Sequence, residues 1–546
     1  MSEHFDLHRP TLEAAVRALS CREYWTPHPE VPSGKIYGET AKAEGEAAFN
    51  ALLGTDFDLP GHPGQQRAGA EVSPFGLRLA ISYPAASPEE LIAATAAAAP
   101  ALAAATVETR VGVCIEALAR LNRQSFLIGN ATMHTTGQAF AMAFQAGGPH
   151  AQDRGLEAVA AAYAEMTRFA ATARWEKPQG KAAPIVMEKS WTLRPAGIAL
   201  TIGCNTFPTW NSYPGLFASL ATGNPVIVKP HPRAILPLAL TVRILREVLA
   251  DAGLPADAVL LAVDEPGAEI TKDLATRPEV RLIDYTGSST FGDWLRDNAR
   301  QAQLFTEEAG VNSVVIAGTR DLDGICANLA FALSLYSGQM CTSPQNIYIP
   351  ADGIDTDKGH KSFDEVAAAL VAAIDSLLAD PARAAGICGA IANPATQARA
   401  TAAARQGRVL RPGVSAGDAG PLLLAVGAAD AVADEECFGP VAFVIAAPDA
   451  DAAIRQAAQL ATDKGAITAA IYDTDAARIA RAEAAFAGAG VNLSINLTGN
   501  IFVNQSAAFS DFHVTGANPA GNASLTDTAF VATRFRRVMS RRLAVV

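Results

Sequence analysis

The chain has 546 residues, too many for one small hydrophobic core, so we expect two or three domains. Half of the residues are hydrophobic and the net charge is −12, which provides no basic surface for nucleic acid or anionic lipid. Seven scattered cysteines without zinc-ligand spacing, no signal peptide and no run of ~18 apolar residues predict a soluble cytoplasmic protein without a metal site or membrane span.

The N-terminal part of the chain divides into three stretches. Residues 1–75 interleave Pro, Gly and aromatic residues, which predicts an irregular N-terminal extension. Residues 88–172 are rich in Ala and Leu with few β-branched runs, which predicts helices. Apolar residues alternate with polar ones over residues 177–194, which predicts a β-hairpin that reaches another subunit as an arm.

From residue 196 onward, the pattern alternates between strands and helices. Short apolar runs predict strands at residues 198–202, 226–228, 259–263 and 282–285, and an amphipathic stretch predicts a helix over residues 233–252. A second series of the same kind begins near residue 313 and ends near residue 497, and a polar tail follows. This alternation predicts an α/β protein with two parallel-sheet domains and a small β arm.

The motif YTGSSTFG, residues 285–292, lies between a predicted strand and a predicted helix. Backbone N–H groups and the helix dipole at such a turn bind phosphate, so Gly287, Ser288 and Gly292 are candidate cofactor residues. The GxGxxG spacing of dinucleotide-binding turns is absent, and a purely structural turn is the alternative.

A second candidate cofactor element is GNPVIVKPHP, residues 223–232. Lys229 stands at the carboxyl end of a predicted strand, the edge where α/β sheets bind ligands, and His231 follows it. The alternative is a solvated lysine at a strand end.

Cys341 is the candidate nucleophile. It lies in SGQMCTSPQ, a loop of small and polar residues between a predicted helix and strand. A reactive thiol needs access and a lowered pKa, whereas Cys114, Cys326 and Cys388 lie in helical or apolar contexts typical of core positions.

Glu307 and Glu308, in FTEEAGVNS, are adjacent carboxylates ahead of a predicted strand. Such a pair is commonly a solvated charged loop. The functional interpretation requires one carboxylate with a raised pKa that activates water or a thiol in a dry cleft.

Six motifs in this order and spacing resemble the aldehyde dehydrogenase superfamily. They are NTFP at residues 205–208, GNPVIVKP, YTGSST, EEAG at residues 307–310, GQMC, and EECFGPV at residues 435–441. The resemblance extends from about residue 85 to the C-terminus. The stretches SCREYWTPHPEVPSGKIYGET, HTTGQAFAMAFQAGGPHAQDRG and TGANPAGNASL are most similar to the PaaN branch, the semialdehyde dehydrogenases of phenylacetate degradation.

The resemblance implies a mechanism with three catalytic residues. Cys341 attacks the aldehyde, Asn205 and the backbone N–H of Cys341 hold the oxyanion, and Glu307 activates the water that hydrolyses the thioester. Because only part of the family pattern around Glu307 is present, Glu308 is the alternative base. NTFP has one residue more than the family motif, which leaves the role of Asn205 open.

The resemblance also implies how a dinucleotide binds. Lys229 bonds the adenosine ribose, Gly287 and Ser288 approach the pyrophosphate, and Glu436 and Phe438 position the nicotinamide half. NAD-preferring members carry a glutamate three residues after the lysine, where this chain has proline and then arginine. Loss of that carboxylate favours NADP, with NAD as the alternative.

The implied fold has four parts. We expect an N-terminal extension over residues 1–75, a dinucleotide-binding domain over 76–172 and 195–305, a catalytic domain over 306–503, and an oligomerisation arm from 173–194 and 504–546. The expected partners are a small aldehyde, which the resemblance suggests is coenzyme A-linked, and a second copy of the chain in a homodimer or homotetramer. Two alternatives are an acylating dehydrogenase that forms an acyl-CoA and a catalytically silent dinucleotide-binding scaffold.

Overall fold

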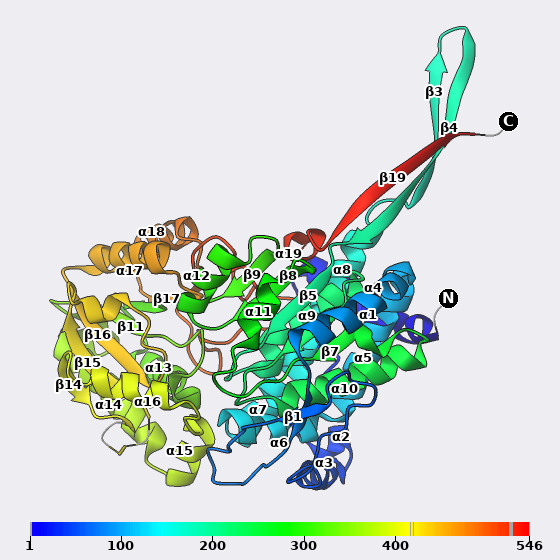
Figure 1. The fold of residues 1–546 in the computed structure, drawn as a ribbon. Coiled ribbons are helices and arrows are strands. Elements are labelled where there is room, and N and C mark those ends of the chain that lie inside the picture. Colours follow the sequence, from blue (N-terminus) through cyan, green and yellow to red (C-terminus); the bar gives the residue numbers. More distant parts are fainter. Residues whose placement is uncertain (1–2, 309, 415–416, 419, 524–527, 545–546) are drawn as a thin grey trace.

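The structure, a computed structural model, describes the chain except residues 1–2, 309, 415–416, 419, 524–527 and 545–546. Two lobes lie side by side, and a long β arm extends away from one of them (Figure 1). Residue 309, in the EEAG motif, and the end of the TGANPAGNASL stretch lie outside the described residues.

The first lobe is built on a five-stranded parallel sheet with the strand order β7-β6-β5-β8-β9. Its strands are β5 (Ile198–Ile202), β6 (Val226–Lys229), β7 (Val259–Leu261), β8 (Val280–Thr286) and β9 (Gln303–Glu307). Their apolar runs are buried on both faces because helices cover both sides, as the alternating pattern predicted. The four strands predicted between residues 198 and 285 are confirmed.

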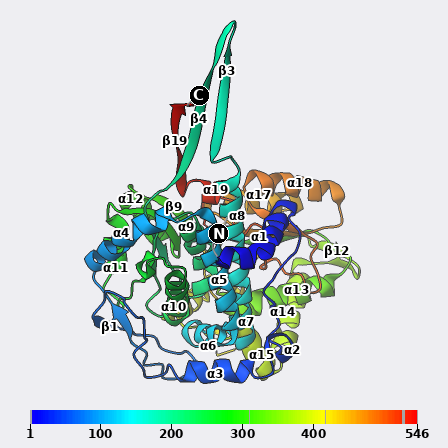
Figure 2. The ribbon, with the colours of Figure 1, turned by 90° about the vertical axis from the view of Figure 1, so that its right-hand side faces the viewer.

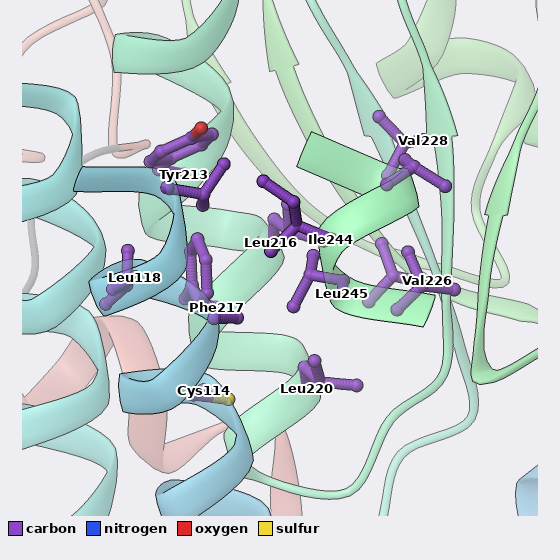
Figure 3. Packing of buried hydrophobic residues seen from close by; sticks show 14 of the residues in the cluster. Cys114, Leu118, Tyr213, Leu216, Phe217, Leu220, Val226, Val228, Ile244 and Leu245 are labelled. Carbon is purple, nitrogen blue, oxygen red and sulfur yellow. The ribbon is translucent and has the colours of Figure 1, made fainter. Parts of the chain in front are cut away.

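The helices between residues 88 and 298 pack against the sheet or against one another. They are α4 (Pro88–Ala104), α5 (Val107–Arg123), α6 (Ser125–Thr136), α7 (Phe140–Gly147), α8 (Pro149–Thr167), α9 (Pro208–Ala221), α10 (Leu236–Asp251), α11 (Ile270–Thr276) and α12 (Ser289–Asn298). Every residue of α9 is buried. Figure 3 shows why: Phe217 of α9 faces Leu118 of α5, while Ile244 of α10 and Val228 of β6 pack beyond it. A rigid helix therefore leads from the NTFP motif into the core.

The second lobe is built on a seven-stranded sheet with the order β14-β15-β16-β11-β10-β17-β18. Its strands are β10 (Ser313–Ile316), β11 (Asn346–Pro350), β14 (Arg408–Arg411), β15 (Leu422–Gly427), β16 (Val441–Ala447), β17 (Thr468–Tyr472) and β18 (Asn492–Ile495). All neighbours are parallel except β14 and β15. The helices are α13 (Leu322–Ser334), α14 (Phe363–Leu378), α15 (Pro381–Cys388), α16 (Pro394–Ala403), α17 (Ala450–Lys464) and α18 (Ala476–Gly488). The prediction of an α/β protein with two parallel-sheet cores is confirmed, while the exact domain boundaries remain a prediction.

The arm is a three-stranded antiparallel sheet formed by β3 (Thr172–Gln179), β4 (Ala182–Pro195) and β19 (Phe535–Leu543). It extends well beyond both lobes (Figures 1 and 2). The predicted hairpin over residues 177–194 is confirmed as β3 and β4. The basic stretch near the C-terminus adds the third strand along β4.

The prediction of an irregular N-terminal extension was wrong. Helix α1 (Glu3–Cys21) packs against α5 and α8, and α2 (Gly34–Tyr37) and α3 (Ala41–Asn50) follow. Phe5, Leu12, Ala15 and Ala18 form the buried face of α1. The chain also has two short antiparallel strand pairs, β1 (Gln66–Ala68) with β2 (Tyr83–Ala85) and β12 (Ile354–Thr356) with β13 (Gly359–Lys361).

The predicted arm segment 504–546 is also only partly an arm. Residues 504–523 run along both lobes and contact residues 306, 342 and 466, and only β19, after the short helix α19 (Thr528–Ala532), joins β4. The tail is held there because its asparagines bond to the backbone of the lobes, as Asn522 does to Thr306. This stretch brings residues to the site described next.

Among the described residues, no single helix is long and apolar enough to cross a membrane. The pair α4 and α5, bent by 118° at the break between them, passes that test by length and composition only.

Candidate active site

Two cavities meet at Cys341. One, of about 840 Å³, extends along the carboxyl ends of β5, β6 and β8, and the other, of about 820 Å³, lies between the two lobes and the N-terminal segment. Phe207, Asn211 and Cys341 line both cavities. A molecule in one cavity can therefore meet a molecule in the other at the sulfur atom.

The loop that carries Cys341 is held in a strained turn. After α13, the backbone of Tyr336, Ser337 and Gly338 has φ of +51°, +51° and +64°, a left-handed conformation that costs energy for residues other than glycine. The buried Tyr336 hydroxyl donates to the carbonyl of Thr136 at 2.6 Å and holds the turn in place.

Asn312 fixes the same loop from the other side. Its Nδ2 donates to the carbonyls of Cys341 at 2.8 Å and Ser343 at 3.0 Å, while its Oδ1 accepts from the backbone N–H of Ile467 and Thr468. Because this amide is buried and satisfied on both ends, it ties the loop to the edge of the seven-stranded sheet.

Glu307, the last residue of β9, points at the nucleophile. Its Oε1 accepts from Nδ2 of Asn211 at 3.1 Å and lies 3.1 Å from Nε2 of His513. The same His513 nitrogen lies 3.5 Å from Sγ of Cys341. One possible ligand atom from each of Glu307, Cys341 and His513 lies within 4.8 Å of the others, so three distant segments form one cluster. Such a trio could also hold a metal ion, and the expectation of no metal remains a prediction.

The protonation of this cluster differs from the expectation. Burial, together with the charge and the hydrogen bond of Glu307, raises the pKa of the Cys341 thiol well above its usual range, where a lowered pKa was expected. Burial acts to raise the pKa of Glu307, but His513, Cys341 and Asn211 stabilise the carboxylate, and the net pKa is lowered. The resting site therefore holds the proton on sulfur and the charge on Glu307, because three donors converge on that carboxylate.

The carboxylate of Glu308, the alternative base, is directed away from Cys341. Arg296 of α12 binds both of its carboxylate oxygens, at 2.5 and 2.9 Å. This ion pair satisfies both oxygens away from Cys341, so the geometry favours Glu307.

Asn205 lines the first cavity, but its amide is directed elsewhere. Its Nδ2 lies 3.5 Å from the carbonyl of Thr135, at the limit of a hydrogen bond. Asn211, six residues later on α9, is the asparagine that contacts the catalytic cluster. The oxyanion role of Asn205 remains a prediction.

Lys229 is almost fully buried in the first cavity. Its Nζ forms an ion pair with Oδ1 of Asp264 at 2.6 Å and donates to the carbonyl of Pro230 at 2.9 Å. Next to it, burial, Lys229 and Arg233 lower the pKa of His231 to about 4, so this imidazole is uncharged at neutral pH. Lys229 is therefore a buried and paired lysine and not a solvated one, and its contact with a cofactor remains a prediction.

The turn between β8 and α12 lines the same cavity. Ser288 caps α12, with its Oγ accepting from the N–H of Phe291, and Gly287 lies so close to the Tyr285 ring that a Cβ would be 2.3 Å from its hydroxyl. Gly292 is different: it does not line the cavity, and a Cβ there would lie 2.2 Å from the carboxyl carbon of Glu308. Gly292 therefore provides the space that the Glu308 side chain occupies, and it does not line the predicted cofactor site.

Glu436 and Phe438 line the cavity from the second lobe. Burial raises the pKa of Glu436 to about 7. The backbone carbonyl of Phe438 accepts two hydrogen bonds from Arg399, at 3.0 and 3.2 Å, which fixes the loop opposite Lys229.

The first cavity fits a dinucleotide by its donor set. The ammonium group of Lys229 and a carboxyl group suit ribose hydroxyls. The N-terminus of the ten-residue helix α12 suits a pyrophosphate. The residues that the sequence placed in a cofactor site come together there, with the exception of Gly292.

The sequence did not indicate four residues of the site: Asn211, Asp264, Asn312 and His513. Asn211, Asp264 and His513 lie outside the motifs, and Asn312 lies in FTEEAGVNS, where the two glutamates were the candidates. Each acquires its partners from another segment of the chain. His513 is 172 residues from Cys341 in the chain. His513 lies two residues before the TGANPAGNASL stretch, so no motif indicated it.

Comparison with known proteins identifies the family. The chain matches the Aldehyde dehydrogenase family over residues 63–516, and it belongs to that family. It is 30% identical over 278 residues to an N-succinylglutamate 5-semialdehyde dehydrogenase of Paraburkholderia xenovorans (strain LB400), a match that covers 48% of this chain and 54% of that protein. The chain thus spans about half the length of the curated relatives it matches.

Solved structures match over the whole chain. A crystal structure of an NAD-dependent aldehyde dehydrogenase from Burkholderia multivorans is 52% identical, covers 100% of both chains and has a TM-score of 0.97. A 1-pyrroline-5-carboxylate dehydrogenase of Thermus thermophilus, 18% identical over 96% of this chain and 99% of its own with a TM-score of 0.74, shares the fold. So does an NADP-dependent glyceraldehyde-3-phosphate dehydrogenase of Bacillus halodurans, 22% identical over 88% of this chain and 96% of its own with a TM-score of 0.67. The predicted aldehyde dehydrogenase-like fold is confirmed.

Proposed function

We propose that this protein oxidises an aldehyde to the carboxylic acid with NAD(P), through a thioester on Cys341. The observation that carries the proposal is the position of Cys341 between two cavities, with the Glu307 carboxylate in contact with the thiol. A catalytically silent scaffold would need neither the strained turn before Cys341 nor the Glu307 carboxylate beside the thiol where the two cavities meet.

The residues perform the reaction in two stages. Glu307 takes the thiol proton as Cys341 attacks the aldehyde carbon, and the resulting thiohemiacetal becomes a thioester on loss of hydride. The dinucleotide, when bound, accepts that hydride. Glu307 then releases the thiol proton to solvent and, as a carboxylate again, takes a proton from the water that attacks the thioester and releases the acid, which returns Cys341 as a thiol. A carboxylate so close to the sulfur favours water over coenzyme A as the acceptor, with the acylating reaction as the alternative.

NADP is the cofactor that we propose, with NAD as the alternative. Proline at position 232 leaves the turn after Lys229 without a carboxylate that would repel a 2′-phosphate, and Arg233 is adjacent. The NAD-dependent enzyme of B. multivorans, which is 52% identical, keeps the alternative open. The ratio of kcat/KM for the two cofactors decides between them.

For the substrate, we propose a coenzyme A-linked semialdehyde of phenylacetate degradation. Aromatic side chains, namely Trp25, Trp210, Phe331 and Phe502, line part of the second cavity, beside polar and acidic residues such as Glu30 and Asp153. The aromatic part suits a stretch of substrate without charge. Of the lysines and arginines in the described part of the chain, only Arg154 lines it, and Glu157 binds that guanidinium at 2.8 Å. The dicarboxylate named for the N-succinylglutamate relatives would find no unpaired cation there.

We also propose a homodimer or homotetramer joined through the arm, in the cytoplasm. Val538, Met539 and Leu543 of β19 are 52%, 45% and 70% exposed, so the arm presents apolar side chains and a free strand edge to a partner. All seven cysteines are unpaired, as expected in a reducing compartment.

The test is formation of NADPH or NADH by the purified protein with three substrates: a coenzyme A-linked semialdehyde, N-succinylglutamate semialdehyde and a simple aliphatic aldehyde. We expect activity that is highest with the first substrate and absent in Cys341→Ala. Wild-type protein that reduces neither cofactor with any of the three would overturn the proposal.

A further inference from the structure

His513 sits between the two reacting groups of the proposed mechanism. Its Nε2 lies 3.5 Å from Sγ of Cys341 and 3.1 Å from Oε1 of Glu307, and the residue is 4% exposed. The Trp210 ring packs edge-on against the imidazole with centroids 4.5 Å apart, which holds the ring in this position. One nitrogen thus contacts both groups between which the thiol proton must move.

A purely structural role does not account for a histidine here. Nδ1 is buried and finds no hydrogen-bond partner among the described residues, which costs free energy that a phenyl ring of similar shape would avoid. Packing against Trp210 would be equally good with phenylalanine. The polar ring is therefore retained for its Nε2 contacts.

The chemistry of Cys341 needs such a group. A thiolate in a buried site requires a nearby cation or hydrogen-bond donor. The ionisable groups that act on this thiol, namely Glu307, Cys204 and Glu436, all disfavour the thiolate. His513 is the group in contact with the sulfur that can donate to it.

We infer that His513 is a further catalytic residue: its Nε2–H donates to the Cys341 thiolate when the thiol proton passes to Glu307. The inference rests on the proposed function. In the resting site, the Nε2–H donates to the Glu307 carboxylate. When that carboxylate takes the proton from sulfur and becomes neutral, the same N–H turns to the sulfur, which then forms its bond to the aldehyde carbon. The number of protons is unchanged, and no further reagent is needed.

Of the described ionisable side chains, Glu307 and Cys341 are the ones in direct contact with His513. Glu307 comes from β9 and Cys341 from the loop before β11, while α9 contributes the uncharged Trp210 and Asn211. On its own loop, Asp511 accepts from the backbone N–H of Ala507. Arg154, beneath Trp210, is bound to Glu157.

The test is the rate of alkylation of Cys341 by iodoacetamide as a function of pH, measured without aldehyde or cofactor by peptide mass spectrometry. His513→Phe keeps the ring volume and removes the donor, and His513→Gln keeps a donor. His134→Phe is the matched control, because His134 stacks on Phe49 and lines neither cavity. Cys341→Ala gives the background from the other cysteines, and circular dichroism checks the fold of each variant.

We expect His513→Phe to slow alkylation about tenfold at pH 7 and to shift its midpoint upward by about one pH unit, with His513→Gln between it and wild type. Alkylation of His513→Phe at the wild-type rate and midpoint would overturn the inference, as would an equal effect of His134→Phe. Because alkylation needs no substrate, these results stand apart from those of the dehydrogenase assay. Wild type without dehydrogenase activity defeats the proposed function, whereas an unchanged His513→Phe defeats only the role of His513.

Discussion

The backbone of Gly521 pairs with that of Glu307 in an antiparallel bridge, so that the C-terminal tail holds the proposed base in place. Gly521 has φ of +155°, and a Cβ there would lie 2.3 Å from the carbonyl oxygen of Thr306. On either side, Glu308 N–H donates to the carbonyl of Ala520 and Asn522 N–H donates to that of Thr306. The position of the carboxylate thus depends on a segment more than 200 residues away in the chain.

Gly521→Ala should therefore lower kcat by about 100-fold, because a shift of about 1 Å at a catalytic group has such an effect. Steady-state kinetics with the best aldehyde measure it. Gly488→Ala, at the end of α18 where a Cβ would meet nothing within 4 Å, is the matched control and should keep the wild-type kcat. Equal kcat for the two variants would show that the tail does not position Glu307.

Lys229→Met should weaken cofactor binding and also destabilise the protein. The substitution leaves Asp264 buried without its cation, which lowers the free energy of unfolding by about 3–5 kcal/mol. The double variant Lys229→Met, Asp264→Asn should recover most of that stability but not the cofactor affinity. Urea unfolding and titration with NADP separate the two effects; a double variant that binds NADP as wild type does would rule out contact between Lys229 and the cofactor.

Glu436 should make stability depend on pH. Its pKa of about 7 in the folded protein is raised from an ordinary value of 4.5, so the folded state binds the proton more tightly than the unfolded state does. This contribution is complete below pH 4.5 and is lost as the pH rises to about 7. Glu436→Gln should thus be more stable than wild type by about 3 kcal/mol at pH 8 and nearly equal to it at pH 4.5. A stability difference independent of pH would contradict this pKa.

Charges placed on the arm should dissociate the oligomer. In Val538→Glu, Met539→Glu, two carboxylates replace exposed apolar side chains on β19, and analytical ultracentrifugation should show a smaller species than wild type. Val409→Glu, at a 49% exposed position of β14, is the control. A wild-type protein that sediments as a monomer would refute the oligomer proposal.

The sequence predicted those parts of the fold that depend on local apolar patterns. The run at residues 198–202 is β5 with the same bounds, because a strand buried on both faces is a continuous apolar run. Helix α1 was not predicted because Pro10 interrupts the pattern between its two large buried residues, Phe5 and Leu12. In the structure, tertiary packing on α5 and α8 outweighs these weak local signals.

The residues of the site were likewise predicted only where they stand in local sequence motifs. Cys341, Glu307 and Lys229 stand in recognisable motifs, and the structure places them around the two cavities. His513 and Asn312 act through partners 172 and 155 residues away, and no local pattern encodes such contacts. The directions of the pKa shifts at Cys341 and Glu307 could not be predicted from the sequence either, because they depend on which donors surround the Glu307 carboxylate.

The most direct test of the central claim is to trap the thioester. Glu307→Gln is mixed with NADP and the best aldehyde, quenched in acid within seconds, and analysed by peptide mass spectrometry beside wild type. We predict that NADPH stops at about one equivalent per subunit and forms more slowly than in wild type, because position 307 no longer takes the thiol proton. The acyl group on Cys341 should persist longer than in wild type, because the variant cannot activate water. NADPH formation with no acyl group on Cys341 in either protein would contradict the account.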